Sequence, residues 1–344
     1  MPDFSESSPG EIRRHHHPST VDEPRRLRSS VNADLFRLGL TCVLNRPLQP
    51  YLTPVRVTLF RERTIMHSNL TGKVCMVTGA NRGIGYATSV ALARAGAIVT
   101  LVGRDPARLE SARDAIRRTT GADRIDYLPA DLASQAAVRS LAERFRDRHD
   151  RLDVLVNNAA TISEQRQVTV DGRERTFAVN HLAYFLLTRL LLDLLVAAHG
   201  VVVNVAASRH RDAVEGIEDI DSLTGYEMRS AYIRSKLANV SFTLELARRL
   251  GASARANSFC PGATATEALM QFARIPPEQW QQRLAQYPSP DTAAEVAMSV
   301  ITSPGTGRYL EDGVDVTPSP QALDQDLARR LWSRCSALTG LPED

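Results

Sequence analysis

Short apolar runs alternate with helical repeats along this chain from Lys73 onward. Segments such as YATSVALARAGA and AAVRSLAERFRDR repeat their apolar residues at helical spacing. The runs between the helical segments have the composition of buried strands: KVCMVTG, AIVTLVGRD, IDYLPAD, LDVLVNNAA, VVVNVAAS and ARANSFCPG. Strands that alternate with helices form a parallel sheet with helices on both faces. The sequence therefore predicts an α/β fold with a doubly wound parallel sheet.

Composition divides the chain into regions. Residues 1–66 are rich in Pro, Ser and Arg and show no sustained period, which predicts a mostly disordered N-terminal extension. Residues 67–344 are then expected to form a single domain. Within it, residues 267–294 contain four prolines and do not continue the alternation of strands and helices. This segment is interpreted either as a lid over a substrate cleft or as a plain surface excursion.

Charge separates the same regions. The formal net charge of +3 lies entirely in residues 1–66, which hold ten Arg against seven acidic residues, whereas residues 67–344 carry 32 basic and 32 acidic residues. Nucleic-acid binding requires a basic surface, which a neutral domain does not supply. We therefore expect no nucleic-acid partner.

Neither a membrane span nor a metal site is expected. The longest apolar stretch, residues 182–198, is interrupted by Thr188, Arg189 and Asp193 and is shorter than the roughly 20 residues that a transmembrane helix needs. The four cysteines lie far apart and form no CxxC pair, and the three histidines at 15–17 are interpreted as a solvated run. A reducing cytoplasm is the simplest setting for such a chain.

A glycine-rich turn, TGANRGIG, connects the first predicted strand to the first predicted helix. In a sheet of the Rossmann type, such a turn lets backbone amides and the N-terminus of the helix meet the pyrophosphate of a dinucleotide. The position of the turn within a strand–turn–helix–strand unit therefore predicts a dinucleotide site. The candidate contacts in the turn are Thr78, Gly79, Asn81, Arg82, Gly83, Ile84 and Gly85.

Two arginines near this turn favour NADP(H) over NAD(H). Enzymes that bind NAD usually place an acid after the second strand, and those that bind NADP place an arginine nearby. Here Arg104 follows the second predicted strand, and Arg82 lies in the glycine-rich turn. Two guanidinium groups suit the 2′-phosphate of NADP through charge-assisted, forked hydrogen bonds. In the alternative, one or both arginines are solvated and Asp105 serves NAD(H).

Tyr232 and Lys236 lie four positions apart on a predicted helix, in YIRSK, so both side chains leave the same face. A phenol is a poor acid or base near neutrality unless a neighbour such as an ammonium lowers its pKa. The spacing alone occurs often by chance. However, the chain has only two lysines among 42 basic residues. A lysine at this spacing therefore argues for a functional role.

With these strings in place, the chain resembles the short-chain dehydrogenase/reductase family from about Gly72 to the C-terminus. Within that family it is most similar to the retinol dehydrogenase group. Three segments have the residue pattern of that group: FAVNHLAYFLLTRLLLDLL, SKLANVSFTLELARRL and SPQALDQDLARRLWSRCSALTG. The 25 positions from Ala207 to Tyr232 match the long insertion typical of that group. The strings that match the family are TGANRGIG, the pair Asp131 and Leu132, NNAA at 157–160, NHL at 180–182, YIRSK and PGATAT at 261–266.

The resemblance implies a role for each matching residue. Tyr232 would exchange the alcohol proton, and Lys236 would lower the pKa of Tyr232 and hold the nicotinamide ribose. Asn180 would support a water-linked proton path, and Asp131 and Asn157 would frame the adenine. For Asn157 and Asn180, bracing of the sheet and helix is the structural interpretation, and in this family it accompanies the functional role. The remaining candidate cofactor contacts are Leu132, Ala159, Pro261, Gly262 and, at the carboxamide, Thr266.

Two positions depart from the family pattern. Ala160 replaces a usual glycine, a mild change, and NVSS becomes NVAA, so that Ala207 stands where the family carries its catalytic serine. That serine hydrogen-bonds the reacting carbonyl oxygen, and loss of one such donor typically lowers the rate about 100- to 1000-fold. The next residue, Ser208, would face the opposite side of a continuing strand. Ser208 therefore substitutes only if the strand has ended or bulges there.

Two functions from different classes follow. The leading one is an NADP(H)-dependent oxidoreductase that interconverts a carbonyl and an alcohol on a lipophilic small molecule. Retinoids, steroids and biosynthetic ketones all fit an apolar cleft. The alternative is a cofactor-binding protein of the same fold with little or no turnover, because of Ala207.

The resemblance also implies a homodimer, built from the helix after Asn180 and the helix of Tyr232. The first of these helices carries a stripe of leucines at helical spacing, and such a stripe is either interface or core. Its members are Leu190, Leu191, Leu194 and Leu195.

Overall fold

A computed structural model describes residues 69–213, 220, 221 and 225–343 of the chain. The extension predicted for residues 1–66 lies outside the described residues and stays a prediction.

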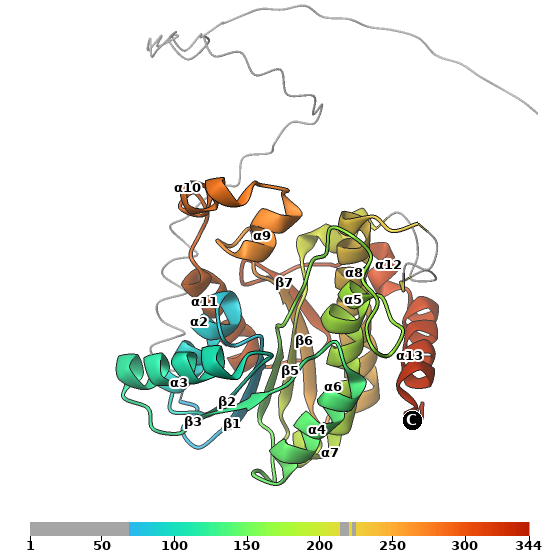
Figure 1. Ribbon diagram of the computed structural model, residues 1–344. Helices are drawn as coiled ribbons and strands as arrows, with labels where there is room; N and C mark the ends of the chain where they lie inside the picture. The colour runs from blue at the N-terminus through green and yellow to red at the C-terminus, as the bar shows by residue number, and fades with distance from the viewer. Residues whose placement is uncertain (1–68, 214–219, 222–224, 344) are drawn as a thin grey trace, which may run out of the picture. The chain divides into compact units, whose positions relative to one another are not determined.

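The described residues form one eight-stranded sheet, with strands β1 (Val74–Thr78), β2 (Ile98–Gly103), β3 (Ile125–Pro129), β4 (Val154–Asn157), β5 (Val201–Val205), β6 (Arg255–Cys260), β7 (Arg308–Glu311) and β8 (Val314–Asp315). The strand order is β3-β2-β1-β4-β5-β6-β7-β8 (Figure 1). All neighbours are parallel except β7 and β8. The order reverses between β1 and β4, as in a Rossmann fold. The predicted doubly wound α/β fold is thereby confirmed.

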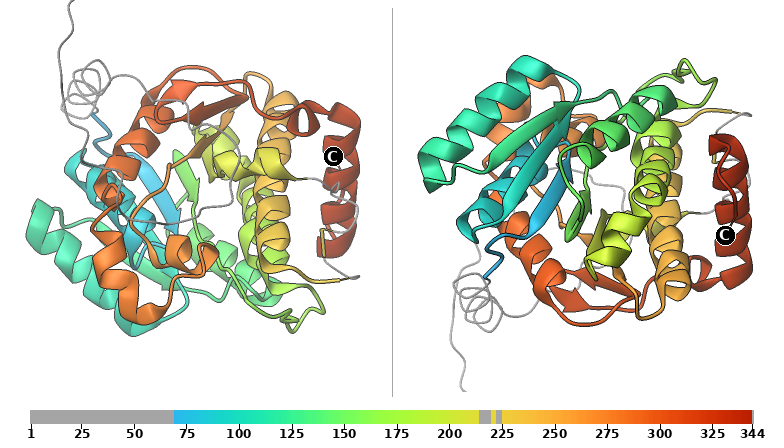
Figure 2. Two further views of the ribbon diagram at one scale, coloured as in Figure 1. Left: turned by 90° about the horizontal axis from the view of Figure 1, so that it is seen from above. Right: turned by 90° about the horizontal axis from the view of Figure 1, so that it is seen from below.

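Helices cover both faces of the sheet, so its central strands are buried. Every residue of β1, β4 and β5 is buried, as the apolar runs VCMVT, VLVN and VVVNV predict for parallel strands. The helices on one face are α2 (Gly83–Arg94), α3 (Pro106–Thr120) and α11 (Pro290–Thr302). Those on the other face are α4 (Gln135–Arg146), α6 (Ala183–Leu190) and α8 (Met228–Leu250) (Figure 2).

Several short elements connect β4 to β5: α5 (Arg175–Phe177), the π-helical turn η1 (Ala178–Leu182), α6 and α7 (Leu192–Ala197). A π-helical turn is rare and is found mostly at functional sites. Here it carries Asn180. The apolar stretch 182–198 is split between η1, α6 and α7, and none of the described helices is both long and apolar enough to span a bilayer.

The leucine stripe of α6 and α7 belongs to the core. Leu191 and Leu195 are fully buried, Leu194 is buried and Leu190 is half-buried, and all four pack into the cluster formed by the sheet, α4 and α8. Of the two readings of this stripe, the structure therefore favours core over interface.

The chain ends in α12 (Pro320–Leu323) and α13 (Gln325–Thr339). Helix α13 packs along α8 on the side away from the sheet (Figure 2). The Trp332 ring lies 5.1 Å from the ring of Phe185 on α6 and 5.8 Å from that of Phe242 on α8. Helix α13 thus covers surface of α6 and α8 that the expected four-helix dimer would use.

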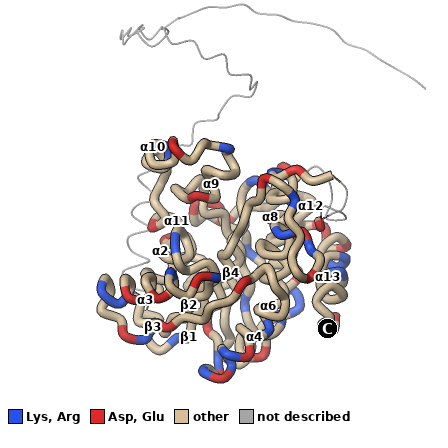
Figure 3. Tube along the Cα trace, in the orientation of Figure 1, with Lys and Arg blue, Asp and Glu red and all other residues tan. Residues whose placement is uncertain are grey.

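Two further regions lie near the carboxyl ends of the strands. The 3₁₀ helix η2 (Ser208–Asp212) follows β5. After β6 come α9 (Glu267–Phe272), η4 (Pro277–Gln279) and α10 (Trp280–Leu284), which form the orange segment at the top of Figure 1. Basic and acidic residues are interspersed over the labelled elements (Figure 3).

Candidate active site

The glycine-rich turn after β1 packs tightly against the end of β4. A Cβ atom built on Gly79 would lie 2.9 Å from the Cα atom of Ala159, and one built on Gly85 would lie 2.4 Å from the Gly79 carbonyl oxygen. Gly79 also adopts a φ of +67°. Only glycine fits both the space and the backbone conformation at Gly79. The sequence thus sets the shape of this turn.

Hydrogen bonds between Thr78 and Asn158 join the turn to β4. Thr78 Oγ1 accepts from the backbone N–H groups of Asn158 at 2.9 Å and Ala159 at 3.1 Å. Asn158 Nδ2 donates to the Thr78 carbonyl at 2.8 Å. Sequence reasoning selected Asn157 and Ala159 but missed Asn158, although the second Asn of NNAA marked it.

The N-terminus of α2 has the features of an anion site. The side chain of its N-cap residue, Arg82, makes no capping hydrogen bond. The first backbone N–H groups of the helix are therefore not occupied by this side chain. Gly83 has a φ of +56°, and its missing Cβ would lie 3.5 Å from Thr266 Cγ2. Free amides at a helix N-terminus attract phosphate. The residues present here therefore fit a dinucleotide pyrophosphate, with Asn81, Ile84 and Gly85 in the same turn.

The two candidate arginines have different partners. Arg82 forms an ion pair with Glu267, the first residue of α9. Arg104 is exposed and lines a cavity of about 210 Å³ together with Asp131. Asp105, the alternative ligand for NAD(H), caps α3 by accepting from the amides of residues 107 and 108 at 3.0 and 3.2 Å. Its carboxylate is therefore engaged by a helix end.

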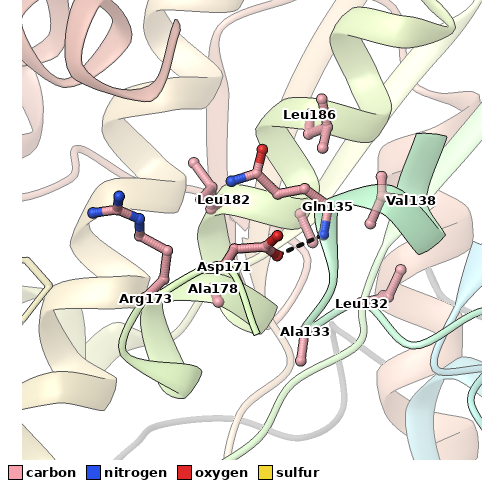
Figure 4. A pocket seen from close by; sticks show the side chains of 10 residues that line it. Leu132, Ala133, Gln135, Val138, Asp171, Arg173, Ala178, Leu182 and Leu186 are labelled. Carbon is pink, nitrogen blue, oxygen red and sulfur yellow. Dashed lines mark hydrogen bonds between the residues drawn. The ribbon is translucent and has the colours of Figure 1, made fainter. Parts of the chain in front are cut away.

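Asp131 and Leu132 face different surroundings. Asp131 is exposed and accepts a hydrogen bond from the Ala133 amide at 3.1 Å. The Leu132 side chain is buried and lines a small cavity of about 10 Å³ between α4 and the η1–α6 segment (Figure 4). At its edge, Asp171 accepts from the Gln135 amide at 2.8 Å. A cavity of this size holds about one water molecule, so it is no ligand pocket.

Tyr232 and Lys236 meet on α8 at the carboxyl end of β5. The Lys236 side chain is 1% exposed, and its ammonium donates to the Val205 carbonyl at 2.9 Å. It lies 5.5 Å from the centre of the Tyr232 ring. The structure therefore brings the two predicted residues together, with the lysine held by the last residue of β5.

Burial dominates the pKa values of this pair. Burial lowers the pKa of Lys236 to about 8, and it raises the pKa of Tyr232 above its ordinary value. That the ammonium lowers the pKa of Tyr232 stays a prediction. A buried phenol resists ionisation because its charged form loses solvation. The Tyr232 ring packs against Phe272 of α9, at 5.2 Å between ring centres.

Asn180 is fully buried and holds the backbone near Thr161. Its Oδ1 accepts from the Thr161 amide at 2.7 Å, and its Nδ2 donates to the Thr161 carbonyl at 3.0 Å. The same Nδ2 lies 3.2 Å from Ser235 Oγ on α8. These contacts correspond to the bracing role expected of this residue, and its part in a proton path stays a prediction.

Asn157 likewise braces the interior. Its Nδ2 donates to Thr188 Oγ1 at 3.1 Å and to Asn204 Oδ1 at 2.9 Å. Asn204 in turn donates to Thr243 Oγ1 on α8 at 2.9 Å. This polar chain joins β4 and β5 to α6 and α8, so the side chain points into the core in this structure.

Strand β5 ends before the position of the missing serine. Ala207 is the N-cap residue of η2, and Ser208 is the first residue of that helix. The strand alternation therefore no longer applies to Ser208. Ser208 lies beside the thiol of Cys260 at the end of β6, and its interaction with the thiol partly offsets the rise that burial causes in the pKa of Cys260.

The turn after β6 completes this edge of the sheet. Gly262 has a φ of +72°, and its amide donates to Cys260 Sγ at 3.4 Å. The Pro261 carbonyl accepts from Thr264 Oγ1 at 2.8 Å. Thr266 caps α9 by accepting from the Leu269 amide at 3.3 Å. The sequence did not predict that Cys260 lies at this site. Its position directly before PGATAT was the one signal.

Known proteins similar to this chain include dehydrogenases. The family described as short chain dehydrogenase matches residues 73–274. Human retinol dehydrogenase 13 is 36% identical over 293 residues, which cover 80% of this chain and 86% of that protein. Mouse polyprenol dehydrogenase is 37% identical over 288 residues, which cover 78% of this chain and 84% of that protein.

Solved structures share the fold. An uncharacterized protein from Mycobacterium paratuberculosis matches with a TM-score of 0.66 and 30% identity, over 80% of this chain and 96% of that chain. The RhlG/NADP active-site complex of Pseudomonas aeruginosa matches with a TM-score of 0.57 and 28% identity, over 72% of this chain and 98% of that chain.

Proposed function

The chain belongs to the short-chain dehydrogenase family, and from that premise we propose that it interconverts a carbonyl and an alcohol on a lipophilic small molecule with NADP(H). The observation that carries the proposal is the pairing of Tyr232 with Lys236 at the edge of the sheet that also holds the glycine-rich turn. The carboxyl ends of the strands thus hold both a proton donor and a candidate phosphate-binding turn. In an open α/β sheet this edge is where ligands bind.

The bound nicotinamide would supply or accept the hydride. Tyr232 exchanges the proton of the alcohol oxygen. The Lys236 ammonium is held by the Val205 carbonyl and lies near Tyr232. It would hydrogen-bond the nicotinamide ribose. The glycine-rich turn and the N-terminus of α2 bind the pyrophosphate. Thr266 lies beside the N-terminus of α2, since a Cβ atom built on Gly83 would lie 3.5 Å from Thr266 Cγ2.

A preference for NADP(H) has two supports. Arg104 stands exposed at the 210 Å³ cavity, whereas the Asp105 carboxylate already caps α3 and so competes less well for a ribose hydroxyl. A solved relative at 28% identity is an NADP complex. Asp131 would then receive the adenine side of the cofactor.

A lipophilic substrate is favoured by the surroundings of Tyr232. Phe272 of α9 packs on the Tyr232 ring, and the guanidinium groups of Arg209 and Arg229 lie 5.9 and 5.7 Å from the Phe272 ring. A substrate that reaches Tyr232 must therefore pass an aromatic side chain. Two relatives are named for retinol and polyprenol. We infer that residues 267–294 act as a lid over Tyr232.

One observation favours the alternative of a cofactor-binding protein with little turnover. Ala207 supplies no hydroxyl, and Ser208 lies beside the Cys260 thiol. A carbonyl oxygen would then receive a hydrogen bond from Tyr232 alone. Lower activity is the expected consequence, because one donor in such a site accounts for about 100- to 1000-fold in rate.

We propose a monomer in place of the homodimer that the resemblance implied. Helix α13 packs on α6 and α8, and Trp332 is buried between Phe185 and Phe242. A second subunit would have to displace it. A cytoplasmic setting remains our inference, supported by Cys75, Cys260 and Cys335, which are all free and buried.

The test combines turnover with binding. Purified full-length protein is assayed for NADPH oxidation with all-trans-retinal, a polyprenal and simple aldehydes, and NADPH binding is measured separately by fluorescence titration. We expect turnover on at least one lipophilic aldehyde that is lost in Tyr232→Phe, whereas NADPH still binds that variant. Binding without turnover on any substrate supports the alternative. Absence of binding contradicts both.

A further inference from the structure

His181, next to Asn180 on η1, is fully buried among the helices of the site. The Phe177 ring stacks on it at 5.9 Å, and the Phe242 ring meets it edge-on at 5.9 Å. Burial lowers the pKa of His181 to about 4, so the ring is neutral near pH 7. A neutral imidazole has one N–H donor and one acceptor nitrogen. Each nitrogen of His181 must therefore have a defined role.

The contacts of Asn239 on α8 decide those roles. Asn239 Nδ2 faces two carbonyl oxygens, that of Asn180 at 2.9 Å and that of Val205 at 3.4 Å. Its Oδ1 therefore faces His181 Nδ1, at 2.9 Å. Because an amide oxygen only accepts, Nδ1 must carry the imidazole proton. His181 Nε2 is then the acceptor.

The partner of Nε2 comes from the C-terminal helix. Cys335 Sγ on α13 lies 3.5 Å from His181 Nε2, and the thiol is 1% exposed. Since Nε2 accepts, the thiol donates. The hydrogen bonds thus form a chain with one donor direction. Cys335 donates to His181, His181 donates to Asn239, and Asn239 donates to the carbonyls of Asn180 and Val205. The Val205 carbonyl is the group that holds the Lys236 ammonium.

We propose that Cys335 and His181 are positioning residues, which orient Asn239 and through it the Val205 and Asn180 carbonyls at the catalytic centre. Helix α13 is then part of the catalytic apparatus and not only a cover for α8. The expected kinetic effect rests on the proposed function. The hydrogen-bond order itself does not, and it can be measured without turnover.

The first experiment determines the tautomer of His181. Full-length protein labelled with ¹⁵N in its histidine rings is examined by NMR between pH 6 and 8, and His181→Phe identifies the signal. We expect the neutral form with the proton on Nδ1. A proton on Nε2, or a charged ring, overturns the proposal because the donor order then fails.

The second experiment follows Lys236 directly. The chain has only two lysines, Lys73 and Lys236, so labelling lysine with ¹³C at Cε yields two signals. Cys335→Ala should move the Lys236 signal and leave that of Lys73 in place. Cys335→Ser, which keeps a donor, should restore it. If the Lys236 signal stays fixed in both Cys335→Ala and His181→Phe, with the protein folded, the proposal is wrong.

The third experiment is kinetic. Cys335→Ala should lower kcat with NADPH and the best aldehyde on the order of tenfold, with the KM for NADPH unchanged, because small displacements at a catalytic centre are costly. Leu327→Ala, a buried change elsewhere on α13, is the control for loss of stability. It should lower Tm as much and keep kcat. An equal loss of kcat in both variants contradicts positioning. If wild-type protein turns over no substrate, the proposed function fails, and the two NMR experiments still decide this inference.

Discussion

Arg82 of the glycine-rich turn forms an ion pair with Glu267, the first residue of α9. The pair joins the predicted phosphate site to the predicted lid. Both side chains are about half exposed, at 57% and 45%, so the pair contributes little to stability. Its significance is competition, because a carboxylate and a 2′-phosphate cannot both take the same guanidinium group fully.

Glu267→Gln should therefore tighten NADPH binding about two- to fivefold, the range expected for releasing an exposed ion pair. NADH lacks the 2′-phosphate, and its affinity should not change. Fluorescence titration of both cofactors measures the effect. Equal tightening of NADPH and NADH would show that Glu267 acts on the lid rather than on Arg82.

Arg104→Ala tests the other candidate phosphate ligand. We expect NADPH to bind the unmodified protein at least about tenfold more tightly than NADH, since charge-assisted contacts to phosphate are strong, and Arg104→Ala to remove most of that difference. Arg108→Ala is the matched control, because Arg108 is exposed and pairs with Asp105 at 3.4 Å but does not line the cavity. Equal affinities in the unmodified protein would refute the preference.

The sequence predicted those parts of the structure that depend on local pattern. Buried parallel strands require continuous apolar runs, and β1, β4 and β5 carry them. The spacing of Tyr232 and Lys236 required both to lie on one helix face. In contrast, β7 and β8 were missed, because RYLE and VD are short and β8 is the edge strand of the sheet.

Contacts between distant segments could not be predicted. The amphipathic pattern of α13 indicates one buried face but not that it packs on α8. Ser208 and Cys260 are 52 positions apart in the sequence, and nothing in either string indicates that they meet. Tyr232 packs against Phe272, a residue of a segment whose placement the sequence left open.

Lys236 should make stability depend on pH above neutrality. Its pKa in the folded protein, about 8, lies below the ordinary value of 10.5, so the folded state releases this proton first as the pH rises. Between pH 8 and 10 the unfolded chain binds more protons, and the free energy of unfolding therefore rises with pH. Relative to Lys236→Met, the gain should be about 2 kcal/mol. Urea unfolding of both proteins at pH 7 to 10 measures it, and parallel profiles would disprove it.

The position of α13 predicts a monomer in solution. Light scattering of full-length protein at micromolar concentration should return the mass of one chain, 37.9 kDa. Trp332→Ala should loosen α13 and destabilise the protein by about 3 to 5 kcal/mol, the usual cost of removing a buried aromatic side chain. A stable dimer mass for the unmodified protein would show that pairing uses another surface or displaces α13.

Ala207 and Ser208 supply the last prediction, on the donor that the site lacks. Strand β5 ends at Val205, so Ser208 is free of the strand alternation, but it lies beside the Cys260 thiol. We therefore expect Ser208→Ala to leave kcat nearly unchanged. Ala207→Ser restores a hydroxyl at the family's position and should raise kcat by up to about 100-fold, with cofactor affinity unaltered, because such a donor acts mainly in the transition state. The opposite pattern, a loss of about two orders of magnitude in Ser208→Ala and no gain in Ala207→Ser, would mean that Ser208 leaves Cys260 to bind the substrate.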